Sequence, residues 1–480
     1  MGDRLGAYRA KRDFDATPEP PPAEEAAEGG RRYVVQEHHA RSMHWDLRLE
    51  HEGTLASWAV PKGIPPDPER NHLAVRTEDH PLEYLEFHGD IPEGSYGAGT
   101  MRIWDRGTYE LHKWRESEVM ITFHGGRLEG RYVLFRTGGK NWMIHRMDPP
   151  QDADREPMPT GLEPMLARAG TLPPEDGRWA YEVKWDGVRA LGYGEGGRLR
   201  LLSRNGNDIT PRYPELRELG RALGSHEAVL DGEVVAFGAD GKPSFQRLQS
   251  RMHLASEAAV RRLAASSPVA YVVFDLLFLD GHPLMALTYD ERRERLLELG
   301  LNGPNWQTPA HRTSDGAALL EATRAQGLEG IIAKRRDCPY VPGRRSPGWV
   351  KVKNVRRTDV VIGGWLGGEG GRAGRLGALV VGYHDEEGAL RYAGRVGTGF
   401  DDQELDRVGK LLAGRERPDS PFEGRQPPKL THFVEPDLVA SVEFSQWTSA
   451  NTLRQPSYKG LRDDVPPEDA RGPREEDPDS

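Results

Sequence analysis

The sequence predicts a multidomain protein with an all-β N-terminal domain, a central α+β domain and a small C-terminal β-barrel of the OB type. The first observation is length, because 480 residues suit about three domains of ordinary size. The second is a proline-rich acidic segment at 149–164, which predicts a linker. The third is periodicity, which passes from strand spacing to mixed strand and helix spacing and back to strand spacing.

Composition limits the kind of protein this is. The net charge of −10 excludes a generic polyanion binder, so any contact with nucleic acid must come from local basic patches. The single cysteine, Cys338, excludes intrachain disulfides and cysteine-rich zinc sites. The N-terminus has no apolar signal segment, and the longest apolar run, 269–279, is too short to span a bilayer. We therefore expect a cytoplasmic protein with no membrane contact.

The first domain is expected at 31–148, after a mobile Pro-, Glu- and Ala-rich arm at 1–30. Short alternating segments broken by Gly and Asp favour a barrel or a sandwich. The expected strands are 33–36, 44–50, 55–60, 73–76, 100–104, 119–123, 131–136 and 142–145.

Strands and helices mix in the central domain, 165–356, and the third domain, 357–464, is again strand-like and glycine-rich. Central helices are expected at 214–223, 257–265, 289–299 and 316–326, and central strands at 181–184, 229–237, 269–279, 330–334 and 349–353. The third domain should hold strands at 360–366, 378–383, 390–396 and 438–447 and a helix near 402–412. Its size suits a five-stranded OB barrel. The acidic tail, 465–480, should be disordered.

Lys184 is a candidate nucleophile in the central domain. The segment 181–190 reads as a strand that runs into a tight turn at Asp186-Gly187, and Glu182 shares a strand face with Lys184. An amine with a reference pKa of about 10.4 must have its pKa lowered before it attacks, and nearby cations would do this. The alternative is a solvated lysine at the end of a surface strand.

A second candidate site lies in the first domain. As a strand, 44–50 places His44, Asp46 and Arg48 on one face, with His38 before it and His80 further on. Two or three histidines with one aspartate suit a first-row divalent metal, and arginine suits a phosphate oxygen. The alternative is the solvated outer face of a hairpin.

Residues 7–147 resemble the 3′-phosphoesterase domain of bacterial and archaeal end-joining ligases, the ligase D family. The shared sequence motifs are Arg12-Asp13-Phe14 with Glu19, the run 38–48, SWAVPKG at 57–63, EDHPLEY at 78–84 and IPEGSYGAG at 91–99. The resemblance implies removal of a 3′-phosphate and of a terminal ribonucleotide. It implies a manganese-like metal on His38, His44 and Asp46. Around the scissile phosphate it places Arg12, Asp13, Glu19, Arg48, His80 and Tyr84, and the N-terminal arm must then fold back over the site.

Residues 165–464 resemble the ATP-dependent DNA ligases, whose nucleotidyltransferase (ATP-grasp-like adenylation) domain precedes an OB-fold. The motifs that carry this resemblance are KWDG at 184–187, SRNG at 203–206, DGE at 231–233, FDL at 274–276, EGIIAK at 329–334 and WVKVK at 349–353. The resemblance implies that Lys184 forms a lysyl-adenylate and that Glu182 accepts from the adenine amine. It gives base stacking to Phe274, sugar or phosphate contacts to Arg189 and Arg204, and magnesium or manganese to Glu233 and Glu329. Positive charge for the phosphates comes from Lys334, Lys351 and Lys353, which also lower the pKa of Lys184.

The last ligase motif is represented by Arg454 and by Arg462 within GLRDD at 460–464, and Arg462 is expected at the ATP phosphates. The family has a lysine after this word where this chain has Val465. We therefore expect that restoring lysine at position 465 speeds self-adenylation.

The resemblances together predict a DNA end-healing and end-sealing enzyme for non-homologous end joining. It would use ATP and Mn²⁺ or Mg²⁺ on the DNA ends and nicks of the nucleoid, with a Ku-type end-binding protein as a possible partner. The family's primase-like polymerase domain has no room in this chain and is expected on another. The alternatives are an RNA ligase or a capping-type nucleotidyltransferase, and a non-catalytic scaffold at DNA ends.

Overall fold

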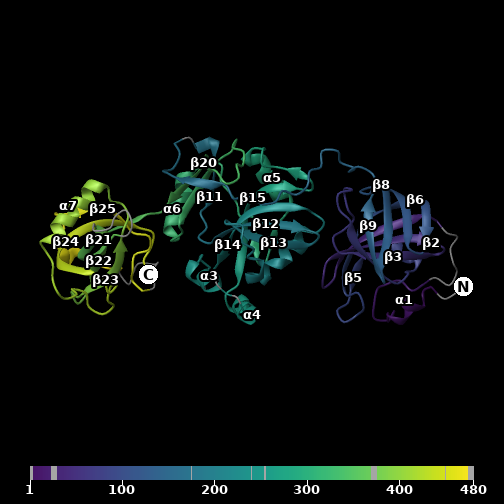
Figure 1. Cartoon of the computed structure of the whole chain (residues 1–480), viewed down its shortest axis with the longest axis horizontal. Coiled ribbons are helices and arrows are strands. Elements are labelled where there is room, and N and C mark those ends of the chain that lie inside the picture. The colour runs from purple at the N-terminus through teal and green to yellow at the C-terminus, as the bar shows by residue number, and fades with distance from the viewer. Residues whose placement is uncertain are drawn as a thin grey trace. The chain divides into compact units, whose positions relative to one another are not determined.

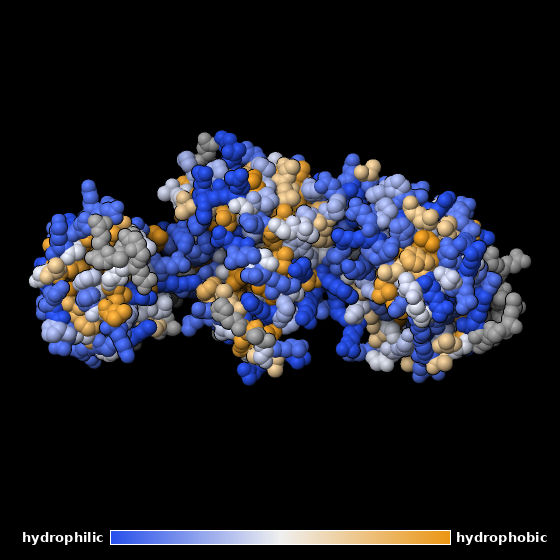
Figure 2. All heavy atoms as spheres, in the orientation of Figure 1, coloured by the Kyte–Doolittle hydropathy of each residue, from blue (hydrophilic) through white to orange (hydrophobic). Residues whose placement is uncertain are grey.

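The computed structural model describes residues 4–22, 30–174, 176–238, 241–252, 254, 256–368, 376–448 and 450–473. The chain divides into two compact units. The first contains 1–168, 173–314 and 333–350, and the second contains 169–172, 315–332 and 351–480. Within the described residues, no helix has both the length and the apolar character needed to cross a membrane. Figure 2 shows hydrophilic residues over most of the visible face, with smaller hydrophobic patches between them.

The N-terminal domain is a closed antiparallel barrel (Figure 1). Its described strands are β1 (Arg32–His39), β2 (His44–His51), β3 (Thr54–Val60), β4 (His72–Arg76), β5 (Gly89–Ile91), β6 (Gly99–Arg115), β7 (Glu118–Gly125), β8 (Glu129–Gly138) and β9 (Asn141–Arg146). The sheet order is β1-β2-β3-β4-β9-β8-β7-β6-β5, and β1 also pairs with β6, which closes the barrel. The expectation of an all-β barrel is confirmed, and each of the eight expected strands lies within one of these elements.

Two apolar clusters sit on opposite faces of the β1–β3 sheet. One fills the barrel and includes Trp45, Leu47 and Leu49, the core face expected for β2. The other lies on the outer face and joins Val34 and Leu55 to α1 (Gly6–Ala10), η1 (Leu82–Leu85) and the segment that follows η1. Polar residues on the outer face of β1–β3 are therefore covered by α1, η1 and the segment that follows η1.

The N-terminal arm departs from the expectation of mobility over its described residues, 4–22. Tyr8 is fully buried in the outer cluster, and its hydroxyl donates to the Pro20 carbonyl at 2.7 Å. Composition predicted disorder because the arm has few apolar residues, but one aromatic anchor and a set of ion pairs hold this arm. Residues 23–29 lie outside the described chain.

The central domain contains two sheets. One has the order β13-β12-β14-β15-β18-β17, with β16 beside β15, and the other has the order β10-β20-β19-β11. The strands are β10 (Leu166–Ala169), β11 (Trp179–Val183), β12 (Val188–Glu195), β13 (Arg198–Ser203), β14 (Ala228–Ala236), β15 (Val269–Leu279), β16 (His282–Pro283), β17 (Asn302–Gly303), β18 (Trp306–Gln307), β19 (Gly330–Arg335) and β20 (Arg345–Lys353). The boundary between the two units falls within β19 and β20.

The helices of this domain are α2 (Glu218–Leu223), α3 (Phe245–Met252), α4 (Glu257–Ser266), α5 (Tyr289–Glu298) and α6 (Gly316–Ala325), with short 3₁₀ turns at η3 (Thr210–Arg212) and η4 (Pro214–Arg217). Of these, α2 packs on β13, α3 on β14 and α5 on β15. Helix α5 begins with a capping box, in which Thr288 and Glu291 satisfy each other's backbone amides. This cap fixes the start of the helix that carries Tyr289. The expected α+β domain is confirmed.

Over its described residues, the C-terminal domain has the sheet order β23-β22-β21-β24-β25 and one α-helix. Its elements are β21 (Arg356–Gly367), β22 (Leu376–His384), β23 (Leu390–Val396), α7 (Asp402–Ala413), β24 (His432–Phe444) and β25 (Ser457–Arg462). Backbone bonds from Leu453 to Ala393 (2.8 Å) and from Tyr458 to Thr398 (2.9 Å) join the two ends of the sheet. This is the expected OB-type barrel.

The acidic tail is ordered where it is described. Residues Pro467–Asp469 form a 3₁₀ turn, Ala470 is buried, and the His384 amide donates to the Ala470 carbonyl at 2.8 Å. Acidic, proline-rich composition predicted disorder, but such a chain can dock in extended form through its carbonyls. Residues 474–480 lie outside the described chain.

Candidate active sites

The expected polar face of β2 exists, and it is buried together with polar residues of β1 and β3. Gln36 and Ser57 are fully buried, and His38, Asp46 and Arg48 are at most 5% exposed. Register explains the grouping, because Gln36 pairs with Asp46, and Arg48 pairs with Ser57 of β3. The solvated-hairpin alternative is therefore wrong.

His38, His44 and Asp46 form a cluster whose possible ligand atoms lie within 4.8 Å of one another. His38 Nε2 bonds the Gly97 carbonyl at 2.9 Å, and His44 Nδ1 bonds the Ser42 carbonyl at 2.9 Å. A carbonyl only accepts, so each of these nitrogens carries the ring proton. In the neutral rings, His38 Nδ1 and His44 Nε2, 3.2 Å apart, then face each other with lone pairs.

Two facing lone pairs beside a carboxylate form a site for a cation. Asp46 Oδ2 lies 3.5 Å from His38 Nδ1, and Asp46 Oδ1 lies 3.9 Å from His44 Nε2. Burial opposes the charge on Asp46, but the adjacent Arg48 guanidinium holds the pKa of its carboxyl well below the usual range. The set of two nitrogens and one oxygen fits a first-row divalent metal.

Arg48 is held rigidly beside this cluster. Its guanidinium donates to Gln36 Oε1 (2.7 Å), Ser57 Oγ (3.1 Å) and Asp46 Oδ2 (3.1 Å), and it lies 4.6 Å from the Tyr84 ring centroid. Three acceptors fix a delocalised cation in one orientation, as an arginine that stabilises a phosphoryl group requires.

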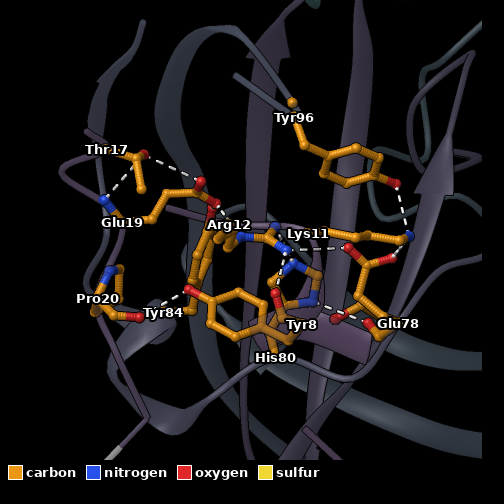
Figure 3. A network of polar contacts seen from close by, with 12 residues as sticks. Tyr8, Lys11, Arg12, Thr17, Glu19, Pro20, Glu78, His80, Tyr84 and Tyr96 are labelled. Atoms are coloured by element: carbon orange, nitrogen blue, oxygen red, sulfur yellow. Dashed lines mark hydrogen bonds and ion pairs between the residues drawn. The ribbon is translucent and has the colours of Figure 1, made fainter. Parts of the chain in front are cut away.

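Arg12 comes from the arm and joins the same region, as Figure 3 shows. Its Nε donates to Glu19 at 2.7 Å, one Nη donates to Glu78 at 3.2 Å, and the other lies 3.3 Å from His80 Nε2. Tyr84 also donates to Glu19, at 2.5 Å. The arm therefore delivers a cation to the outer face, as the resemblance implied.

His80 and Tyr84 hold definite protonation states. Burial, reinforced by the charges of Arg48 and Arg12, keeps the pKa of His80 well below its usual range, so its ring is neutral. Burial likewise raises the pKa of Tyr84, which stays a donor. Asp13 differs from these residues: it is exposed, and its carboxylate accepts from the Asp15 amide at 3.2 Å.

In the central domain, Lys184 directly follows β11, which ends at Val183. Lys184 and Asp186 are half-buried. Gly187 lies close to β14, because a Cβ there would come within 2.2 Å of the Val234 carbonyl oxygen. The strand ends one residue before Lys184, and the chain bends at Gly187 in place of the expected tight turn. The close approach explains why glycine occupies position 187.

Glu182 and Lys334 form a buried ion pair. Their closest atoms are 2.8 Å apart, and both side chains are less than 5% exposed. Tyr289 donates to the other oxygen of Glu182 at 2.6 Å. Lys334 Nζ lies 4.4 Å from the ring centroids of Phe274 and Trp349, and burial lowers its pKa despite Glu182.

This placement differs from the phosphate-binding role expected for Lys334. Its ammonium is bound to the carboxylate that was expected to read the adenine amine, and two aromatic faces surround it. Sequence spacing could not show this, because β19 and β11 lie side by side in one sheet although some 150 residues separate them.

Arg189 is likewise engaged. Both arms of its guanidinium donate to the buried Asp231 at 2.5 Å, and Tyr340 donates to Asp231 at 2.6 Å. The Arg189 guanidinium lies 4.6 Å from the Phe274 ring centroid. The sequence patterns did not mark Asp231, Tyr340, Tyr289 and Trp349 as site residues, although Asp231 and Trp349 lie within the motifs DGE and WVKVK.

Glu233 and Arg204 are placed differently. Glu233 is half-buried and stands opposite Arg189 in the β12–β14 register, which brings it to the same sheet region. Arg204 is exposed in the turn after β13. Arg204 is therefore not part of the buried cluster formed by Glu182, Lys334, Arg189 and Asp231.

The remaining ligase residues belong to the second unit. Lys353 lies 3.0 Å from Glu329 and donates to Gln455 at 3.0 Å, and Lys351 is half-buried two residues earlier on β20. Arg462 is held by Asp464 at 2.7 Å and by Asp359 at 3.2 Å. In this state the expected phosphate partner, Arg462, is bound to carboxylates.

Comparisons with known proteins follow the same division. Family models match as the DNA ligase D 3′-phosphoesterase domain over residues 36–136, the ATP-dependent DNA ligase domain over 164–353 and the ATP-dependent DNA ligase C-terminal region over 372–465. The class is therefore that of the ATP-dependent DNA ligases that carry a 3′-phosphoesterase domain. Within that class, the chain belongs to the ligase D family.

Individual relatives are similar along nearly the whole chain. The multifunctional non-homologous end joining protein LigD of Mycobacterium bovis is 44% identical over 476 residues, 97% of this chain and 61% of that protein. The LigD of Pseudomonas aeruginosa is 35% identical, over 98% of this chain and 62% of that protein. A solved mycobacterial DNA ligase D complexed with ATP and MES is 40% identical, over 65% of this chain and 98% of that chain, with a TM-score of 0.39. The chain thus spans about three fifths of these curated relatives' length.

Proposed function

We propose that this chain heals and seals DNA ends, with a metal-dependent 3′-phosphoesterase in the barrel and an ATP-dependent ligase in the remaining domains. The observation that carries the proposal is the presence, in one ligase D chain, of the buried His38–His44–Asp46 cluster and the strand-end Lys184. The first activity supplies the 3′-hydroxyl that the second consumes.

In the ligase step, Lys184 Nζ loses a proton and attacks the α-phosphorus of ATP. The new N–P bond replaces the bond to pyrophosphate, which leaves. The AMP then passes to the 5′-phosphate of a nick, and the 3′-hydroxyl displaces it. Glu233 is the proposed ligand for Mg²⁺ or Mn²⁺ in the first unit, and Glu329 is proposed separately as a ligand for such an ion in the second. The metal would neutralise phosphate charge.

The Glu182–Lys334 pair supports a role in reading adenine. Glu182 accepts from the exocyclic amine and Lys334 donates to N1, so adjacent acceptor and donor match adjacent groups on the base. Phe274 and Trp349 supply apolar surface beside them. This role replaces the phosphate contact expected for Lys334.

In the phosphoesterase step, His38, His44 and Asp46 would hold the divalent metal, which would polarise a phosphoryl oxygen. Arg48 and Arg12, each fixed by its carboxylate partners, stabilise the charge that develops on the reacting phosphate.

The test is nick sealing on a duplex with a 3′-phosphate. Lys184→Ala should remove the phosphate without joining the strands, whereas His44→Ala should join only ends that already carry a 3′-hydroxyl. Labelled ATP, and not GTP, should mark the wild-type chain and His44→Ala. Labelling by GTP would favour a capping-type enzyme instead.

The substrates are DNA ends and nicks in the nucleoid, with a Ku-type protein as the proposed partner. The names of the relatives, which are non-homologous end joining proteins, support DNA ends as the substrate. Pull-down of a Ku-type protein with the chain on linear DNA would test it.

A further inference from the structure

An exposed tyrosine stands beside the buried polar cluster of the barrel. Tyr96 is 49% exposed, whereas the other two tyrosines among the polar contacts of Figure 3, Tyr8 and Tyr84, are at most 1% exposed. The ring of Tyr96 is therefore accessible to a ligand from solvent, which the two buried rings are not.

A rigid turn presents this ring. The Ala98 amide donates to the Ser95 carbonyl at 3.2 Å, which makes Ser95-Tyr96-Gly97-Ala98 a hydrogen-bonded turn. Gly97 has a φ of +78°, the conformation that the third position of a type II turn requires. The Gly97 carbonyl also accepts from His38 Nε2. The residue after Tyr96 therefore orients the imidazole ring of His38 within the His38–His44–Asp46 cluster.

Cations flank the same ring, as Figure 3 shows. Lys11 donates to the Tyr96 hydroxyl at 3.1 Å and to Glu78 at 2.9 Å, and its Nζ lies 4.4 Å from the ring centroid. The Arg12 guanidinium lies 5.5 Å from that centroid. An exposed aromatic ring next to arginine and lysine is the arrangement that binds an unpaired nucleobase with its backbone phosphates.

We propose that Tyr96 is the stacking platform for the terminal base of the 3′ end, with Lys11 on the neighbouring backbone phosphate. The inference rests on the proposed phosphoesterase function and adds a specificity element to it. The buried cluster recognises the phosphate, and Tyr96 recognises that a nucleoside carries it. Nucleic-acid 3′ ends are thereby favoured over small phosphomonoesters, for every base, because each base has a π-face.

The first experiment compares 3′-phosphate removal from two oligonucleotides that differ only in whether the terminal residue carries a base. Tyr96→Ala should raise KM about tenfold on the base-bearing end, with little change in kcat, and should leave the abasic end unaffected. Tyr96→Phe should behave as wild type, and Leu73→Ala, an exposed apolar control on β4, should change neither substrate. An equal loss on both ends, or no loss, would overturn the proposal.

The second measurement does not depend on turnover. A 3′-phosphate oligonucleotide with terminal 2-aminopurine should lose fluorescence on binding the wild-type chain and Tyr96→Phe, but not on binding Tyr96→Ala. Quenching that is unchanged in Tyr96→Ala rules out stacking even if the phosphate is removed. Tyr96-dependent quenching without phosphate removal supports the platform and counts against the phosphoesterase.

Discussion

Single side chains in this protein are constrained by what they are buried with. Lys334 and Glu182 show this most clearly, because each is a charge that only its partner makes tolerable in the interior. The resemblance to DNA ligases implies a role at the nucleotide for both residues, but only the fold shows that they neutralise each other. The effect of a mutation at either position should therefore be compared with that of the double variant.

Lys334→Met should destabilise the central domain by about 3–5 kcal/mol, because it leaves the Glu182 carboxylate buried without its cation. Adding Glu182→Gln should recover most of that loss. Urea denaturation of the single and double variants measures the coupling. Additive losses would show that the two side chains do not depend on each other.

At the element scale, the N-terminal arm completes the proposed phosphoesterase site on the outer face of the barrel, because it contributes Arg12. Tyr8→Ala should cost about 3–5 kcal/mol of the arm's docking free energy and release it from the outer cluster. Cleavage by trypsin at Lys11 and Arg12 should accelerate, and 3′-phosphate removal should fall while nick sealing continues. Tyr8→Phe, which loses only the bond to Pro20, should cost about 1 kcal/mol.

The start of β1 depends on a buried carboxylate on β2. Glu50 is fully buried and accepts from Arg32 and from the Gly30 amide. Burial opposes its charge, but these donors lower the pKa of Glu50 below its usual value. Since the folded-state pKa is lower, the stabilisation is present at neutral pH and is lost as pH falls through that pKa.

Glu50→Gln should therefore lower the melting temperature at pH 7, and the difference from wild type should shrink as the pH falls below about 4.5. Thermal unfolding at a series of pH values measures this. Glu110→Gln, an exposed carboxylate on β6, is the matched control. A difference that stays constant down to pH 3 would contradict the linkage.

At the scale of the whole molecule, the two proposed activities occupy separate domains of one chain. Lys184→Ala and His44→Ala should therefore complement each other when mixed, and together they should seal a nick with a 3′-phosphate that neither seals alone. Gel analysis of the joined strand measures this. Failure of the mixture, with each variant's remaining activity intact, would show that both activities must act from one molecule.

Much of the architecture was predictable because it depends on local signals. Alternating apolar residues predicted the eight barrel strands, and spacing predicted helices such as α5 and α7. The short strands β16, β17 and β18 were not predictable, because two residues carry no period. Helix α3 was missed, and the arm was misjudged because its order depends on a distant partner surface.

By itself, the sequence determined the domain order, the face of β2 that carries His44, Asp46 and Arg48, and the strand end at Lys184. Each follows from the period of a strand or the chemistry of a turn. Only the tertiary structure decided that Arg12 reaches His80, that Lys334 binds Glu182 and that Tyr96 stands exposed beside a buried cluster. These depend on strand pairings and long-range burial, in which residues far apart in sequence share one low-dielectric environment.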